Sequence, residues 1–194
     1  MKHNLITLTI DHKTVEVPEG TTILAAAKSV GISIPTLCYL NLSDFGCVNT
    51  PSSCRMCLVE VEGRRNLAPA CVTPASDKMT VSTNSVRALK TRKTMLELLL
   101  SDHPKDCLTC QKSGNCELQS LADKFSIRDI KLKGEQSAYR LDISKSLIRD
   151  MDKCIMCRRC ETMCNEVQTV GVLSAINRGF ESVIATAMEI NLSD

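Results

Sequence analysis

The distribution of cysteine constrains this chain more than any other feature of its sequence. The chain has 194 residues and twelve cysteines, most of which lie in groups that contain a C-x2-C pair. A secreted chain of this composition would form disulfides. Residues 1–13, however, alternate polar and apolar side chains and lack the apolar stretch of a signal peptide. In the reducing cytoplasm, where we expect this protein, C-x2-C pairs indicate metal sites.

The densest group lies in the segment DKCIMCRRCETMCNEV and contains Cys154, Cys157, Cys160 and Cys164. The spacing C-x2-C-x2-C-x3-C is typical of a ferredoxin, in which three thiolates bind one [4Fe–4S] cluster and the fourth binds a second. Structural zinc sites usually use two separated pairs of ligands, so the crowding favours iron–sulfur over zinc. No cysteine follows Cys164. We therefore expect the missing ligands to come from another chain or from the continuation of a longer polypeptide, and we favour the longer polypeptide.

A second candidate site combines one histidine with three cysteines. The segment HPKDCLTCQKSGNC places His103, Cys107, Cys110 and Cys116 in the spacing H-x3-C-x2-C-x5-C. These four side chains make a complete ligand set, and an imidazole in place of a thiolate alters the charge and potential of an iron–sulfur cluster. Zinc accepts the same ligands, so the spacing alone leaves the metal open.

The third group consists of Cys38, Cys54, Cys57 and Cys71, in the spacing C-x15-C-x2-C-x13-C. A [2Fe–2S] cluster typically has four thiolate ligands. A loop that wraps around the cluster supplies most of them, and the fourth comes from a distant position. Cys47 is left over and could replace Cys54 as a ligand. We prefer Cys54, because it keeps the C-x2-C pair next to a predicted strand, and we interpret Cys47 as a spare thiol.

Hydrophobic periodicity predicts an α+β chain. Residues 5–17 alternate with period two and predict a hairpin, after which Thr21 or Thr22 caps a helix that ends near Gly31. Segments 57–63 and 66–83 predict further strands. We expect four parts along the chain: a first domain over residues 1–83, a second over 84–125, a connector over 126–146 and a last domain over 147–194.

The second part begins with a predicted helix that Asn84 or Ser85 caps and that runs to Leu100. Its apolar face is predicted to hold Leu89, Leu96, Leu99 and Leu100. Its basic face, which we interpret as solvated, holds Arg87, Lys90, Arg92 and Lys93. A further helix is predicted over 116–125, and a hairpin around residues 177–179.

The remaining sequence features exclude several classes of function. The net charge of +2 indicates no nucleic-acid partner. The sequence contains no apolar run of about eighteen residues, so we expect no membrane span. The chain has no G-x-G-x-x-G or P-loop motif for a nucleotide. Its three histidines, His3, His12 and His103, indicate no Ser-His-Asp arrangement. We assign no catalytic residue, because bound cofactors would carry the redox chemistry.

The motifs, taken in order, resemble the N-terminal iron–sulfur region of the large subunit of NAD(P)-linked electron-bifurcating [FeFe]-hydrogenases. The matching segments are IPTLCYL, CRMCLVEVEGRRNLAPAC, DHPKDCLTCQKSGNCELQSLA, CIMCRRCETMCNEVQTVGV and NRGFES. The same modules are similar to those of NADH dehydrogenase and of NAD-dependent formate dehydrogenase. The resemblance implies a β-grasp [2Fe–2S] ferredoxin-like domain and a small helical [4Fe–4S] domain with one histidine and three cysteine ligands. The first half of a two-cluster ferredoxin-like domain would follow them.

The resemblance also implies the ligands of each cluster. They are Cys38, Cys54, Cys57 and Cys71 for [2Fe–2S]; His103, Cys107, Cys110 and Cys116 for [4Fe–4S]; Cys154, Cys157 and Cys160 for a further [4Fe–4S] cluster; and Cys164 for a second cluster of that domain. The chain departs from the usual pattern in the longer loop before Cys54 and in Asn165, where simple ferredoxins have proline. Because the second cysteine quartet and the domain of the diiron H-cluster are missing, hydrogen chemistry is inferred only from the resemblance.

We therefore expect a segment that relays single electrons between a flavin- and NAD(P)-binding subunit, ferredoxin and a hydrogen-activating site. A small [2Fe–2S] subunit is a further expected partner in this multisubunit oxidoreductase. The alternative is an iron–sulfur subunit of formate dehydrogenase or NADH dehydrogenase. A more remote alternative is a zinc-binding interaction module.

Overall fold

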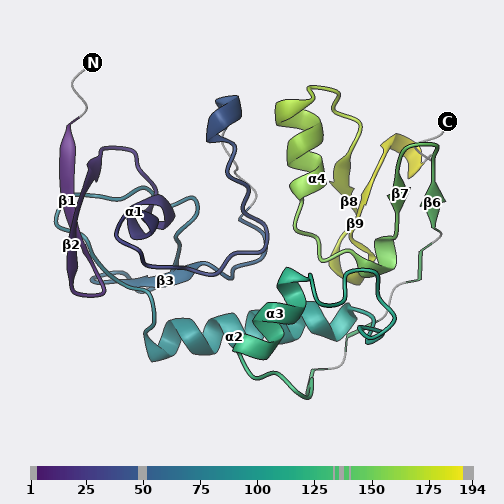
Figure 1. Ribbon diagram of the computed structural model, residues 1–194, viewed down its shortest axis with the longest axis horizontal. Helices are drawn as coiled ribbons and strands as arrows, with labels where there is room; N and C mark the ends of the chain where they lie inside the picture. The colour runs from purple at the N-terminus through teal and green to yellow at the C-terminus, as the bar shows by residue number, and fades with distance from the viewer. Residues whose placement is uncertain (1–3, 48–51, 133, 136–137, 140, 190–194) are drawn as a thin grey trace. The chain divides into compact units, whose positions relative to one another are not determined.

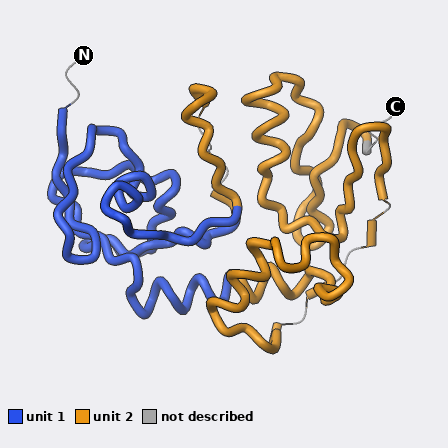
Figure 2. The backbone as a smooth tube through the Cα atoms, in the orientation of Figure 1, with its two compact units in different colours: residues 1–37, 54–95 blue, residues 38–53, 96–194 orange. Residues whose placement is uncertain are grey.

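The computed structural model describes residues 4–47, 52–132, 134–135, 138–139 and 141–189 (Figure 1). The chain divides into two compact units, shown in Figure 2. Unit 1 contains residues 1–37 and 54–95, and unit 2 contains residues 38–53 and 96–194. None of the helices in the described ranges has the length and apolar content that a membrane span requires.

Unit 1 is built on a five-stranded sheet with the strand order β2-β1-β5-β3-β4. The strands are β1 (Leu5–Ile10), β2 (Lys13–Pro18), β3 (Leu58–Val61), β4 (Ala68–Pro69) and β5 (Thr80–Ser82). Strand β1 pairs with β5 in parallel, whereas the other pairs are antiparallel. The predicted hairpin over 5–17 and the strands predicted within 57–63 and 66–83 are therefore confirmed.

Alternation of apolar residues explains the first hairpin. Leu8 of β1 lies opposite Val15 of β2, and both side chains are buried. The two-residue turn between the strands consists of Asp11 and His12, both with positive φ (45° and 69°). This backbone matches the right-handed twist of the strands, which tight hairpin turns need.

Unit 1 contains the short helix α1 (Ile23–Ser29). Of the two predicted caps, the side chain of Thr22 accepts a hydrogen bond from the backbone N–H of Ala25 at 3.3 Å. The helix buries Ile23, Ala26 and Ala27. Gly31 follows with φ 75°, a conformation that favours glycine after a helix.

Helix α2 (Val86–Asp102) starts in unit 1, and Ser85 caps it by accepting a hydrogen bond from the N–H of Ala88 at 3.2 Å. The interpretation of its faces was wrong at two positions. Leu89, expected on the apolar face, is 39% exposed, whereas Arg92, expected on the solvated face, is only 1% exposed. The buried stripe contains Ala88, Arg92 and Leu96, which lie four residues apart on one side of the helix.

Unit 2 consists of short helices and two small hairpins. The helices are α3 (Glu117–Lys124), α4 (Arg159–Thr162), the π-helix η3 (Met163–Val167) and the 3-10 turns η1 (Ser43–Phe45), η2 (Met151–Lys153), η4 (Gly179–Glu181) and η5 (Ala187–Glu189). The hairpins pair β6 (Asp142–Ile143) with β7 (Ile148–Arg149) and β8 (Ser174–Ile176) with β9 (Val183–Ala185). Helix α3 and the hairpin around 177–179 match the predictions, whereas β6 lies in a segment that we interpreted as an irregular connector.

A buried ion pair explains why this polar segment forms a hairpin. Arg149 Nη2 lies 2.5 Å from Asp142 Oδ2, and both side chains are largely buried. Arg149 Nη1 also donates a hydrogen bond to the carbonyl of Ile184 in β9 at 3.1 Å. One arginine therefore holds the two hairpins of unit 2 together.

Candidate functional site

Three of the predicted [2Fe–2S] ligands lie in unit 1, around the start of β3 and the end of β4. Cys54, Cys57 and Cys71 are each at most 5% exposed. Cys57 Sγ donates a hydrogen bond to Cys71 Sγ at 3.3 Å. Between the two cysteines of the C-x2-C pair, Arg55 has a φ of 56°, so the loop bends sharply at this point. The turn brings the backbone N–H of Met56 within 3.5 Å of Cys54 Sγ.

The pKa of Cys57 indicates that this group of thiols can bind a metal centre. Its hydrogen bond to Cys71 raises the pKa of the Cys57 thiol, and burial raises it further. Without a cation the thiolate form of Cys57 is therefore strongly disfavoured. A bound metal deprotonates a coordinating thiol outright, so buried thiols in contact fit a soft metal centre.

The two remaining cysteines of this region belong to unit 2. Cys38 is buried, at 1% exposure. Cys47 is partly exposed, and its Sγ donates hydrogen bonds to the carbonyl oxygens of Phe45 and Glu166, each at 3.4 Å. Residues 48–51, between Cys47 and Cys54, lie outside the described residues. The choice of Cys54 over Cys47 stays a prediction.

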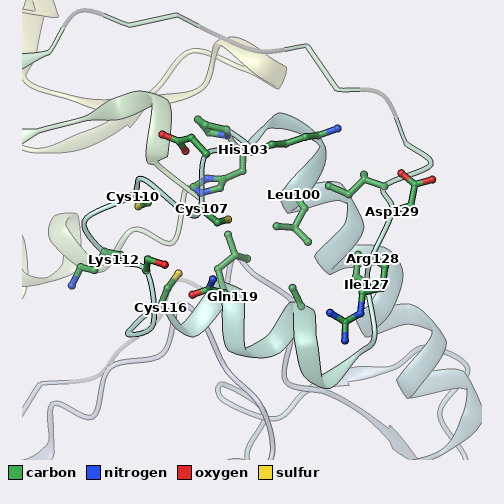
Figure 3. Close-up of a pocket in the computed structure, with 17 residues that line it drawn as sticks. Leu100, His103, Cys107, Cys110, Lys112, Cys116, Gln119, Ile127, Arg128 and Asp129 are labelled. Atoms are coloured by element: carbon green, nitrogen blue, oxygen red, sulfur yellow. The ribbon is translucent and has the colours of Figure 1, made fainter.

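The predicted histidine-containing site of unit 2 surrounds a cavity of about 370 Å³. His103, Cys107, Cys110 and Cys116 all line it, and Figure 3 shows them around the cavity. His103 directly follows α2 and Cys116 directly precedes α3, so the two helix ends fix the limits of the loop. Apolar side chains complete the lining; they include Leu100, Leu118, Ala122 and Ile127.

His103 has the properties of a metal ligand. Burial lowers the pKa of its imidazole, which favours the neutral form that binds metals. Its Nδ1 atom is buried and has no hydrogen-bond partner among the described residues. A buried nitrogen without a partner is costly, and a metal bound to it would remove that cost.

The first three ferredoxin-type cysteines, Cys154, Cys157 and Cys160, lie between η2 and η3, and Cys160 is in helix α4. Met156 and Arg158 have positive φ values of 51° and 59°, so the backbone turns twice within the C-x2-C-x2-C run. The N–H of Met156 donates a hydrogen bond to Cys154 Sγ at 3.4 Å. Burial raises the pKa of the Cys154 thiol. The first three cysteines thus share one winding segment, whereas Cys164 lies in the π-helix η3.

Within the described residues, no group of three or more His, Cys, Asp or Glu side chains is arranged to hold a single metal ion. An iron–sulfur cluster distributes its protein ligands over several irons, so these ligands do not meet at one point.

Two ion pairs join the loops of the two predicted [4Fe–4S] sites in unit 2. Lys153 Nζ lies 3.7 Å from Asp106 Oδ2, and Arg159 Nη2 lies 2.9 Å from Glu117 Oε2. Each of these four residues is the sequence neighbour of a predicted cysteine ligand. The structure thereby brings together two motifs that the sequence analysis treated separately.

Sequence reasoning missed one residue beside the predicted [2Fe–2S] site. Arg92 donates hydrogen bonds from Nε and Nη2 to the carbonyl of Leu58, at 3.0 and 2.6 Å. Leu58 directly follows Cys57. The signal that could have revealed Arg92 is its spacing of four residues from both Ala88 and Leu96 in the buried stripe.

Comparison with known proteins agrees with the cluster types. Residues 3–86 match a family described as a 2Fe-2S iron-sulfur cluster binding domain. Residues 92–131 match the NADH-ubiquinone oxidoreductase-G iron-sulfur binding region. These matches confirm the prediction of [2Fe–2S] and [4Fe–4S] cofactors. They argue against the alternative of a zinc-binding module.

Similar proteins cover nearly the whole of this chain. The NADP-reducing hydrogenase subunit HndD of Solidesulfovibrio fructosivorans is 66% identical over 98% of the chain, which spans 33% of that protein. A G-type subunit of the NADH-quinone oxidoreductase of Rhizobium meliloti is 39% identical over 93% of the chain, which spans 21% of that protein. The chain thus spans a third or less of the length of these two relatives.

A solved structure has a similar fold. A chain in the crystal structure of an NAD+-reducing [NiFe]-hydrogenase in the H2-reduced state superimposes with a TM-score of 0.85 at 30% identity. The match covers 97% of this chain and 78% of that chain. Together these likenesses confirm the predicted resemblance. This chain belongs to the family of iron–sulfur electron-transfer subunits that includes the G-type subunit of NADH-quinone oxidoreductase and its counterparts in NAD(P)-linked hydrogenases.

Proposed function

We propose that this chain is the iron–sulfur electron-transfer segment of an NAD(P)-linked, electron-bifurcating [FeFe]-hydrogenase. The observation that carries this proposal is the 66% identity, over 98% of the chain, to a subunit of an NADP-reducing hydrogenase. The segment would relay single electrons between a flavin- and NAD(P)-binding subunit, ferredoxin and a hydrogen-activating site. The described residues include no candidate for hydrogen activation itself, so the proposed role is electron transfer alone.

The proposed ligands follow the sequence motifs. They are Cys38, Cys54, Cys57 and Cys71 for the [2Fe–2S] cluster; His103, Cys107, Cys110 and Cys116 for one [4Fe–4S] cluster; Cys154, Cys157 and Cys160 for another; and Cys164 for a second cluster of the last domain. Support comes from the contact between Cys57 and Cys71 and from the cavity beside His103. We propose the β-grasp, helical and ferredoxin-like domains over 1–83, 84–125 and 147–194.

The clusters, when bound, accept and donate single electrons. The chain holds them, limits access of water and donates hydrogen bonds to their sulfur ligands. The N–H groups of Met56 and Met156 are placed for this, because they already lie within hydrogen-bonding distance of Cys54 and Cys154. Hydrogen bonds to ligand sulfurs and burial both tune the potential of a cluster. The proposed partners are a flavin- and NAD(P)-binding subunit, a small [2Fe–2S] subunit and ferredoxin, in the cytoplasm.

The match of residues 92–131 to the NADH-ubiquinone oxidoreductase-G region favours a second candidate. In that case the segment would serve an NADH dehydrogenase rather than a hydrogenase. The electron-transfer role of the chain would be the same, but the final electron acceptor would differ.

Anaerobic purification of the intact complex tests both the clusters and the activity. We expect iron and acid-labile sulfide, together with EPR signals of [2Fe–2S] and [4Fe–4S] clusters in the reduced sample. We also expect reduction of NADP+ by hydrogen. Material with negligible iron would refute the cluster sites. Clusters accompanied by electron transfer from NADH to a quinone, without hydrogen turnover, would favour the second candidate.

A further inference from the structure

We propose that Arg92 is a positioning residue whose buried positive charge raises the reduction potential of the [2Fe–2S] cluster. The inference rests on the proposed function, because it requires Cys57 to be a ligand of that cluster. It goes beyond that function by assigning the control of one potential to a residue outside the ligand motifs.

The burial of Arg92 needs a physical reason. The side chain is 1% exposed and belongs to the largest fully buried side chains of the described residues. Burial of a guanidinium group is costly unless a negative charge or several hydrogen bonds compensate it. None of the ion pairs found in the described part of the chain includes Arg92.

The hydrogen bonds of Arg92 fix its charge beside a predicted ligand. Nε and Nη2 both donate to the carbonyl oxygen of Leu58, at 3.0 and 2.6 Å. The fork geometry of arginine makes this orientation rigid. Because Leu58 is bonded to Cys57, the guanidinium is held one peptide unit from the sulfur-bearing residue.

Burial and two acidic side chains, Cys57 and Asp11, act on this charge. Burial lowers the pKa of Arg92, whereas Cys57 as a thiolate, and to a smaller extent Asp11, raise it. The carboxylate of Asp11 is itself engaged, because it accepts hydrogen bonds from the N–H and the hydroxyl of Thr83. Because Cys57 carries a negative charge only when it is deprotonated, as a metal-bound cysteine is, this attraction would act with a cluster in place.

A bound cluster would complete the charge balance. Its thiolates would supply the negative charge that Arg92 lacks. Since reduction adds one electron to the cluster, a fixed positive charge nearby favours the reduced state. The effect is strong in a buried site, where the effective dielectric constant is low.

Redox titration of the intact complex, followed by the EPR signal of the [2Fe–2S] cluster, tests this role. We expect Arg92→Met, which removes the charge but fills a similar volume, to lower the ratio of reduced to oxidised cluster at a fixed potential at least tenfold. For a one-electron couple this corresponds to a shift of about 59 mV to lower potential. Arg92→Lys keeps the charge and should stay within threefold of the original ratio.

The matched control is Lys93→Met, which removes the same charge from an exposed position on the same helix. Solvent screens that charge, so the ratio should not change. An unshifted potential in Arg92→Met overturns the proposal. If Arg92→Met loses the cluster, the Arg92→Lys variant decides. A potential near the original supports the role of charge. A tenfold lower ratio of reduced to oxidised cluster, or loss of the cluster, overturns it. Absence of the [2Fe–2S] signal in the unaltered complex would instead refute the proposed function.

Discussion

The fold buries the predicted ligand residues to different degrees. Cys54, Cys57 and Cys71 are almost completely buried, whereas Cys107 and Cys160 are exposed. Burial disfavours a free thiolate, so the first three need a bound metal to remain deprotonated, and the same burial would keep water away from the cluster they hold. Exposed ligands instead leave a cluster accessible to electron-transfer partners. The two predicted classes of site therefore suit different positions in an electron-transfer chain.

Replacement of His103 tests the mixed ligand set at this scale. We expect His103→Ala to abolish or strongly perturb one [4Fe–4S] EPR signal and to leave the [2Fe–2S] signal unchanged, because His103 lines the cavity with Cys107, Cys110 and Cys116. His103→Cys should retain that [4Fe–4S] cluster at a lower potential, since a thiolate adds negative charge. EPR spectra of the reduced variants provide the measurement.

The control for this experiment is His12→Ala, which removes an exposed histidine from the turn between β1 and β2. It should leave every cluster signal intact. Loss of the [2Fe–2S] signal in His103→Ala, with every [4Fe–4S] signal retained, would contradict the assignment of the ligand sets.

These candidate ligands could be predicted because they lie close together in the sequence. Residues whose partners are distant in the sequence, such as Arg92, could not. His103 and its three cysteine partners lie within one short segment, so the motif is visible without knowledge of the fold. The burial of Arg92 depends on the carbonyl of Leu58, which is 34 positions away in the chain. No pattern over a few residues contains that information, so we interpreted Arg92 as part of a solvated face.

Among the secondary-structure elements, one hairpin was predicted and another was missed. The reason is again whether a pattern of neighbouring residues reveals the structure. The first hairpin was predicted because alternation runs through the six residues of β1 and through residues 14–17 of β2. The β6–β7 hairpin was missed because each strand has only two residues. Its stability depends on the ion pair between Asp142 and Arg149; in the sequence Asp142 looks like an ordinary polar residue of the predicted connector, and Arg149 lies just after that connector.

Arg149 should therefore matter more to stability than a surface arginine does. We expect Arg149→Met to lower the free energy of unfolding by about 3–5 kcal/mol, because it removes the cation of a largely buried ion pair. Arg128→Met is the matched control. Its pair with Asp123 is largely exposed, so the loss should stay within about 1 kcal/mol.

Urea unfolding of the anaerobic protein, followed by circular dichroism, measures both changes. Equal effects of the two substitutions would show that the buried pair does not hold the hairpins of unit 2 together.

For the whole molecule, the distribution of apolar burial differs between the two units. Most buried apolar side chains among the described residues belong to unit 1; those of its sheet and helix α1 include Leu8, Ile10, Val15, Val17, Ile23, Val59 and Val81. Unit 2 has fewer; they include Leu42, Leu96, Leu118, Leu173, Val183 and Ile184. Aromatic residues make up only 3% of the sequence, so they cannot compensate. Small apolar cores commonly need metals as additional cross-links.

Removal of iron should therefore loosen unit 2 more than unit 1. In hydrogen–deuterium exchange, we expect the chelated protein to lose protection in α3, in α4 and in the loops that carry the [4Fe–4S] ligands. Strand β1 and helix α1 should keep most of their protection, because their apolar contacts do not involve a metal. Metal binding and folding are coupled wherever the ligands come from otherwise weakly packed segments. Anaerobic reconstitution with iron and sulfide should restore the protection of unit 2. Equal loss of protection in both units would mean that the apolar core of unit 1 is not sufficient to hold its sheet without the [2Fe–2S] cluster.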